Sequence, residues 1–202
     1  MTRIDYFQLA SVSIVLLVIV GKAVYSWITT GINPVVIGRG QGWWRVIELL
    51  SSLSVVLWII EVALRALHSR FVIFPHALPV ALLHTPAAKG LGVFFVILGV
   101  TLLLLAYLSF GASWRMGIDR QTPGALVTNG IFAVSRNPIY VGSILCFIGI
   151  FLINGTWFFL IFTLLAIVGI HFEILREEDF LMQQHGAEFS KYRERTARYL
   201  IW

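Results

Sequence analysis

Five charged residues follow directly after an apolar run near the C-terminal end of the chain. They stand where a membrane-spanning segment would leave the bilayer, and they are Glu173, Arg176, Glu177, Glu178 and Asp179. Glu173 and Glu177 are four residues apart and therefore share one face of a helix. Ionisable groups at membrane depth are costly, so they indicate function unless they merely pair with each other. The alternative is a solvated helix start with an Arg–Glu pair.

A second polar group, Ser135-Arg136-Asn137-Pro138, precedes another apolar run. Pro138 suits the first turn of a helix, where its missing N–H costs nothing. Arg136 and Asn137 would then lie at a helix N-terminus, a place that favours anions. The simpler interpretation makes Arg136 a residue of the membrane edge and Asn137 a helix cap. Turn signals at Pro123-Gly124 and Asn129-Gly130 mark the loop before this group.

The elements that position these groups are predicted to be membrane-spanning helices. Of the 202 residues, 58% are hydrophobic and only 12% are charged, with a mean hydropathy of +0.87. We therefore expect an all-α integral membrane fold, because about 20 apolar residues are enough to cross a bilayer. The five expected spans are 7–28, 44–66, 89–110, 138–153 and 156–173, and residues 174–196 are expected to form an amphipathic helix.

The domain organisation is predicted to be a single membrane domain over residues 1–202. Three spans fill 1–110, while 111–202 holds a cofactor-binding loop, a tight helical hairpin at Asn154-Gly155 and the C-terminal helix. The side carrying 22–45, 111–137 and the tail has eleven Lys and Arg residues against four on the other side. The positive-inside rule therefore puts the C-terminus and the loop in the cytoplasm. The lack of a recognisable targeting signal fits a prokaryotic inner membrane.

Two classes of partner are excluded by composition. The five histidines are scattered and there is a single cysteine, Cys146, so no group has the spacing of a metal site. The net charge of +5 reflects basic loops, because no basic cluster interleaved with aromatic residues indicates nucleic-acid binding.

Taken together, the C-terminal clusters resemble the isoprenylcysteine carboxyl methyltransferases and the related phospholipid N-methyltransferases. The similar stretches are Ser113-Trp114-Arg115, 126–132, 136–142, the pair Glu177-Glu178, and then Gly186, Phe189 and Tyr192. The resemblance implies S-adenosylmethionine as cofactor. It also implies a set of cofactor-binding residues: Leu126, Val127, Gly130, Phe132, Asn137, Pro138, Tyr140, Glu177 and Glu178.

The sequence departs from the carboxyl methyltransferases at two positions. Asn137 stands where that family often has histidine. Glu173 stands where it has an arginine near the substrate carboxylate, and a glutamate there would repel a carboxylate and attract an amine. We therefore expect a lipid-like acceptor with an amine or neutral head, entering sideways from the membrane. Glu173, together with Arg136, is assigned to the catalytic group.

Two other functions remain open from the sequence. One is a sterol-reductase-like oxidoreductase that uses NADPH, although no dinucleotide-binding glycine fingerprint is present. The other is a non-catalytic membrane scaffold or transport protein. Transport is disfavoured because the polar residues gather at one face of the membrane.

Overall fold

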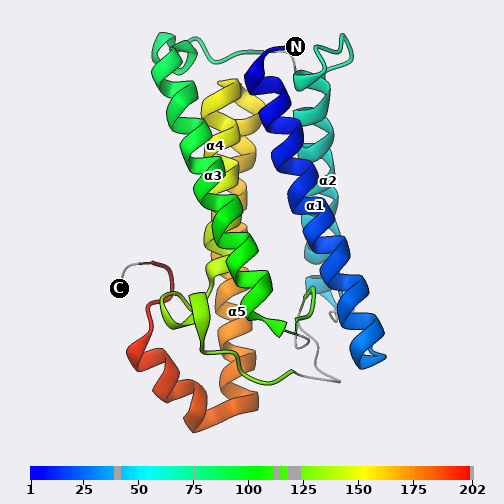
Figure 1. Cartoon of the computed structure of the whole chain (residues 1–202), viewed down its shortest axis with the longest axis vertical. Helices are drawn as coiled ribbons and strands as arrows, with labels where there is room; N and C mark the ends of the chain where they lie inside the picture. The colour runs from blue at the N-terminus through cyan, green and yellow to red at the C-terminus, as the bar shows by residue number, and fades with distance from the viewer. Residues whose placement is uncertain (39–41, 75, 112–113, 118–123, 201–202) are drawn as a thin grey trace.

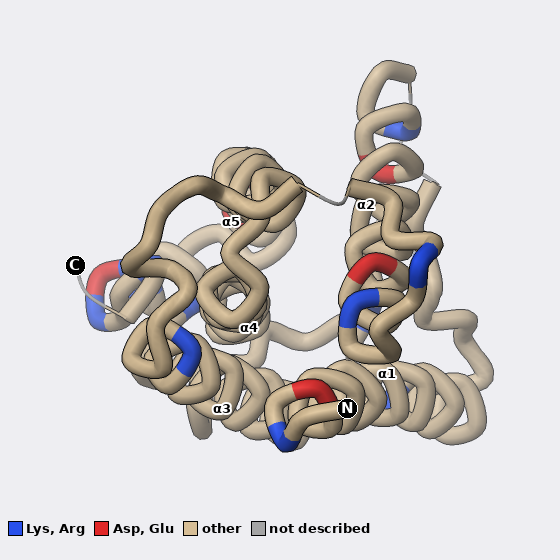
Figure 2. Tube along the Cα trace, turned by 90° about the horizontal axis from the view of Figure 1, so that it is seen from above, with Lys and Arg blue, Asp and Glu red and all other residues tan. Residues whose placement is uncertain are grey.

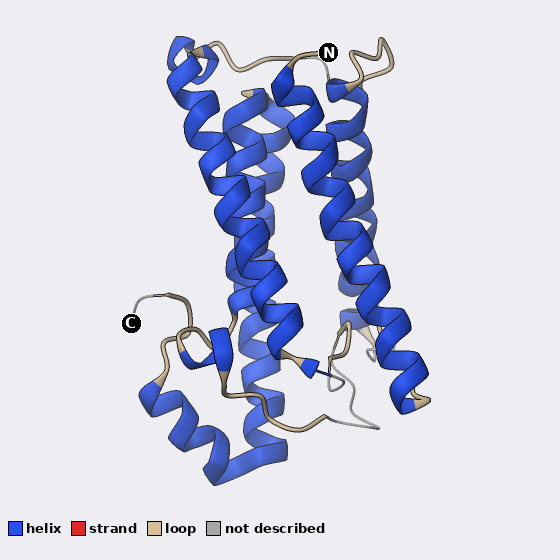
Figure 3. Ribbon diagram, viewed as in Figure 1, coloured by secondary structure: helices blue, strands red, loops and turns tan. Residues whose placement is uncertain are grey.

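The computed structural model describes residues 1–38, 42–74, 76–111, 114–117 and 124–200. Within these ranges every extended regular element is a helix (Figure 3). The five α-helices are α1 (Arg3–Thr30), α2 (Trp43–Ala66), α3 (Pro86–Ser109), α4 (Pro138–Asn154) and α5 (Trp157–Arg195). Two short 3₁₀ turns, η1 (Ala81–His84) and η3 (Gly130–Ala133), lie in the connections before α3 and before α4.

The predicted all-α membrane fold is confirmed. Four helices, α1, α2, α3 and α5, are long and apolar enough to cross a bilayer. Helix α4 has 17 residues, which agrees with the expectation of a short hairpin. Gly155 ends α4 in the left-handed conformation with φ of 59°, and Thr156 then precedes α5 directly.

Helix α5 differs from the expected span followed by a separate amphipathic helix. It runs for 39 residues, and its one break is at Gly186, where φ is 47° and ψ is −116°. No proline or glycine lies between 174 and 185, so the helix continues past the apolar part that ends near residue 173. Beyond Gly186 the chain turns back toward the bundle (Figure 1).

Helices α3 and α4 touch through their backbones. A Cβ added to Gly99 would lie 2.6 Å from the Gly142 carbonyl oxygen, and one added to Gly92 would lie 2.7 Å from that of Gly149. Glycine pairs allow such an approach because they carry no side chain. Each pair is separated from the next by seven residues on both helices, so the contact repeats along one face.

Seen along the bundle axis, α1 and α2 stand next to each other beside the group formed by α3, α4 and α5 (Figure 2). The core between the two groups is centred on Trp58 of α2, whose ring meets Phe147 edge-on at 5.1 Å and stacks on Phe162 at 5.8 Å. The N-terminus lies at one end of the bundle, and the connection before α4 and the C-terminal segment lie at the other (Figure 1).

Candidate functional site

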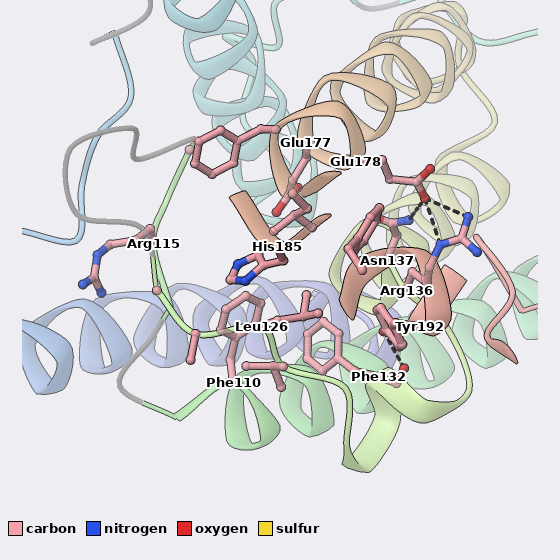
Figure 4. A pocket seen from close by; sticks show the side chains of 17 residues that line it. Phe110, Arg115, Leu126, Phe132, Arg136, Asn137, Glu177, Glu178, His185 and Tyr192 are labelled. Carbon is pink, nitrogen blue, oxygen red and sulfur yellow. Dashed lines mark hydrogen bonds and ion pairs between the residues drawn. The ribbon is translucent and has the colours of Figure 1, made fainter. Parts of the chain in front are cut away.

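A pocket lies at the end of the bundle that holds the C-terminal segment. It contains about 810 Å³ of empty space, part of it open to solvent. Its walls come from the end of α3, the connection to α4, the start of α4, the polar part of α5 and the segment after the Gly186 kink. The pocket thus joins the two polar groups that the sequence places about 40 residues apart (Figure 4).

Seven of the eleven residues assigned to the site from the sequence line this pocket. They are Leu126, Val127, Phe132, Arg136, Asn137, Glu177 and Glu178. The predicted loop residues of the segment 118–123, and Ser113, fall outside the described residues.

The other four residues lie beside the pocket. Gly130 opens the η3 turn at φ 59°, where a Cβ would lie 2.4 Å from the Ser109 hydroxyl oxygen. Pro138 is buried at the first turn of α4. The Tyr140 hydroxyl donates a hydrogen bond to the Glu177 carboxylate. Glu173 accepts a hydrogen bond of 2.6 Å from Arg176.

Glu177 is the acidic side chain that faces the pocket without a cationic partner among the described residues. Its carboxylate accepts a hydrogen bond from the Tyr140 hydroxyl. Burial raises the pKa of Glu177 to about 6, and the charges of Glu173 and Glu178 act in the same direction, against the hydrogen bond from Tyr140. Near neutral pH this carboxylate is therefore mostly ionised and available to a cation.

Glu178, the next residue, forms ion pairs with arginines of the protein itself. Its Oε1 lies 3.0 Å from both Nε and Nη2 of Arg136, and its Oε2 accepts 2.8 and 3.1 Å bonds from Arg198. Burial favours the neutral form, but the Arg198 hydrogen bonds and the Arg136 charge outweigh it and hold the pKa of Glu178 below its usual range. Successive helical residues point about 100° apart, so the two glutamates face different surroundings.

Arg136 holds the C-terminal segment in place. Besides Glu178, its Nη1 donates to the backbone carbonyls of Arg193, at 3.0 Å, and Thr196, at 2.5 Å. Its own backbone N–H donates to the Ala197 carbonyl at 2.9 Å. Asn137 adds a 3.1 Å bond from Nδ2 to the Arg198 carbonyl. These contacts close the segment after Gly186 over the start of α4.

Several pocket residues were not assigned to the site from the sequence. They are Phe110, Arg115, Gly117, Gly124, Ala125, Phe180, Leu181, His185, Phe189 and Tyr192. The apolar spacing of 180–192 indicated a buried helix face but not what that face covers. His185 was counted among scattered histidines, because only the fold turns it toward Glu177 and Leu126 (Figure 4).

A charged cluster connects the pocket side of α5 with α2. Arg176 Nη2 lies 3.2 Å from Glu48 Oε1, and its Nη1 lies 2.6 Å from Glu173 Oε2. The Arg176 guanidinium also stands 4.0 Å from the centre of the Trp44 ring. Glu173 is therefore paired in this arrangement and lies next to Glu177 without lining the pocket.

Residues 88–188 match the family described as Phospholipid methyltransferase. The matched stretch is half of the chain and covers α3, α4, the connection between them and α5 past its kink. The chain belongs to the phospholipid methyltransferase family. No curated protein matches the chain.

This membership confirms the resemblance drawn from the C-terminal clusters and makes the chain a membrane methyltransferase. All the elements that build the pocket fall within the matched residues except the last part of α5, which carries Phe189 and Tyr192. Helices α1 and α2 lie outside the match.

Proposed function

We propose that this methyltransferase uses S-adenosylmethionine and methylates an amine-bearing or neutral lipid-like acceptor. The observation that carries the proposal is Glu177, an ionisable carboxylate facing a pocket with an aromatic wall and lacking a cationic partner among the described residues. A carboxylate in such surroundings selects a cation.

The chemistry of the pocket fits this cofactor. Its sulfonium and α-ammonium groups suit the Glu177 carboxylate, and its adenine suits the rings of Phe110, Phe132 and Phe189. Arg115, which also lines the pocket, suits its carboxylate. The cofactor, when bound, supplies a methyl group that is open to nucleophilic attack.

In this proposal the two glutamates of the pair have different tasks. Glu177 binds the cofactor directly, whereas Glu178 keeps Arg136, Asn137 and the C-terminal segment in position. Arg136 thereby acts as a positioning residue, since its donors serve Glu178 and two backbone carbonyls. The backbone of Leu126 and Val127 and the Gly130 turn shape the opposite wall.

Glu173 is proposed to serve the acceptor. It lies one helical turn before Glu177, at the level where the apolar part of α5 ends, so a lipid head at the membrane edge can reach it. An ammonium acceptor must lose a proton before its nitrogen lone pair can attack, and Glu173 is the group assigned to take that proton. The remaining work is orientation of the two reactants.

The membrane arrangement that goes with this proposal has the pocket on the cytoplasmic side. The excess of basic residues at that end supports this orientation. The cofactor then enters from the cytoplasm and the acceptor enters sideways from the lipid. A prokaryotic inner membrane remains the proposed location.

The cofactor assignment is tested by isothermal titration of the detergent-purified protein with S-adenosylhomocysteine, and separately with NADPH. We expect binding of the first ligand only. Glu177→Ala should weaken it at least about tenfold, the scale of one charge-assisted hydrogen bond. Asp179→Ala is the matched control, because this acid is exposed on the same helix. Binding of NADPH instead would favour a reductase, and unchanged binding by Glu177→Ala would reject the assigned role.

The acceptor assignment is tested by transfer of labelled methyl groups to matched lipids with an amine, a hydroxyl or a carboxylate head. We expect the carboxylate to be the poorest acceptor. Glu173→Gln should lower kcat for the amine more than it changes the affinity for S-adenosylhomocysteine. Preference for a prenylcysteine carboxylate would overturn this part of the proposal.

A further inference from the structure

A second pocket lies at the opposite end of the bundle, and none of the residues assigned to methyl transfer line it. It holds about 980 Å³ of empty space, part of it open to solvent. The start of α1, the end of α2, the first turn of α3 and the end of α4 form its walls. Figure 2 looks down on this end, where charged residues of both signs surround the N-terminus.

The acidic groups of this pocket are already paired. The Oδ2 atom of Asp5 lies 2.9 Å from His68 Nε2 and also accepts the backbone N–H of Thr2. Just behind the pocket, Glu61 Oε1 accepts a 2.7 Å bond from Arg65 Nε, and its Oε2 accepts a 2.8 Å bond from the backbone N–H of Ile73. Both carboxylates therefore already accept hydrogen bonds from the protein, Glu61 on both oxygens and Asp5 on Oδ2.

The basic groups retain free donors. Lys89 is half-buried, and its ammonium has no ion pair within the described part of the chain. Arg65 uses Nε for Glu61 and one Nη2 bond for the Phe74 carbonyl, whereas a guanidinium has five N–H groups. The hydroxyls of Thr2 and Ser69 line the same space. The uncommitted groups are therefore mainly donors, with a positive charge on Lys89.

We propose that this pocket binds an anionic phosphate group. A phosphate oxygen accepts from ammonium, guanidinium and hydroxyl donors together, which is the set present here. The pocket opens where four helices meet the edge of the membrane, so the headgroup of an anionic phospholipid is the favoured source. Free phosphate shares this chemistry and is separated by the experiment.

The test uses the full-length protein in a neutral detergent, titrated with short-chain phosphatidylglycerol, short-chain phosphatidylcholine or inorganic phosphate. We expect phosphatidylglycerol to bind, and phosphatidylcholine to bind at least about tenfold more weakly because its choline offsets the phosphate charge. Lys89→Gln should weaken phosphatidylglycerol about tenfold, and Lys89→Arg should keep it within about threefold. Arg70→Gln is the matched control, since Arg70 is an exposed cation at the same end that does not line the pocket.

The outcomes separate the sources from each other and from the methyltransferase proposal. Binding of inorganic phosphate as tight as that of the lipid, and equally lost in Lys89→Gln, would support the site and assign it to a free anion. Equal binding of the two lipids, or no effect of Lys89→Gln, would overturn it. Titration of S-adenosylhomocysteine with the same variants should be unchanged, so failure here leaves the cofactor pocket untouched.

Discussion

Helix packing within the C-terminal half of this membrane protein differs from the packing between its two halves. In the C-terminal half, α3 and α4 approach so closely that two pairs of glycines bring backbone against backbone. Between the two halves, the described contacts of α2 with α5 are made by long side chains, with Trp58 in the middle of the bundle and Trp44 and Glu48 at the pocket end.

This difference indicates which half of the protein fixes the shape of the pocket. The matched family residues begin with α3, and the glycine contacts lie between the two helices that lead into and out of the pocket connection. A backbone contact leaves no room for adjustment, whereas long side chains can repack. Perturbations of equal size should therefore be far more damaging in α3–α4 than in α2–α5.

The largest effect is expected from Gly99→Leu. Its Cβ would lie 2.6 Å from the Gly142 carbonyl oxygen and 2.7 Å from Cys146 Sγ, so the two helices must separate. We expect a loss of more than about 3 kcal/mol and little folded protein by size-exclusion chromatography in detergent. A Cβ added to Gly21 in α1 meets nothing within 4 Å, so Gly21→Leu should behave like the wild type. If the two variants are equally stable, the proposed difference in packing is wrong.

Glu178→Gln should have the next largest effect, confined to the C-terminal segment. Glu178 and Arg136 have side chains only 8% and 7% exposed, and breaking a buried ion pair costs about 3 kcal/mol. The segment after Gly186 should then open, which accelerates tryptic cleavage at Arg193 and Arg195. Asp179→Asn, an exposed neighbour, should be cleaved at the wild-type rate.

The pH dependence of cofactor binding should follow Glu177. Its pKa is raised to about 6, so the carboxylate is ionised above that pH and loses its charge as the pH falls. Affinity for S-adenosylhomocysteine should therefore drop about tenfold from pH 7.5 to pH 5. Glu177→Gln should bind weakly at both values. If Glu177→Gln keeps the full pH dependence, another group is responsible for it, and His185 is the next residue to replace.

The smallest effect is expected from Trp44→Leu. This ring lies 4.0 Å from the Arg176 guanidinium but is 40% exposed, so we expect a loss of about 0.5–1 kcal/mol in detergent unfolding. Trp43→Leu changes the neighbouring ring, which is 74% exposed, and should cost less. A large loss in Trp44→Leu would mean that the N-terminal half is attached more firmly than its contacts indicate.

The sequence alone determined the membrane class, the helix positions and the tight turn at Asn154-Gly155. Hydrophobic length and composition are additive along the chain, so they can be read without knowing what packs where. The spacing of the C-terminal clusters also brought out seven of the seventeen residues that line the pocket. It did not reveal that α5 continues past the membrane to Gly186, because polar helix residues are predicted equally well as a separate element.

The tertiary structure decided that the neighbours Glu177 and Glu178 have different contacts. The two residues are chemically identical and adjacent, so no pattern separates them. They differ because the helix turns one carboxylate toward the pocket and the other toward Arg136 and Arg198, which arrive from the start of α4 and from the C-terminal segment. Charge compensation depends on distances of a few ångströms between distant parts of the chain, and only the folded arrangement determines those distances.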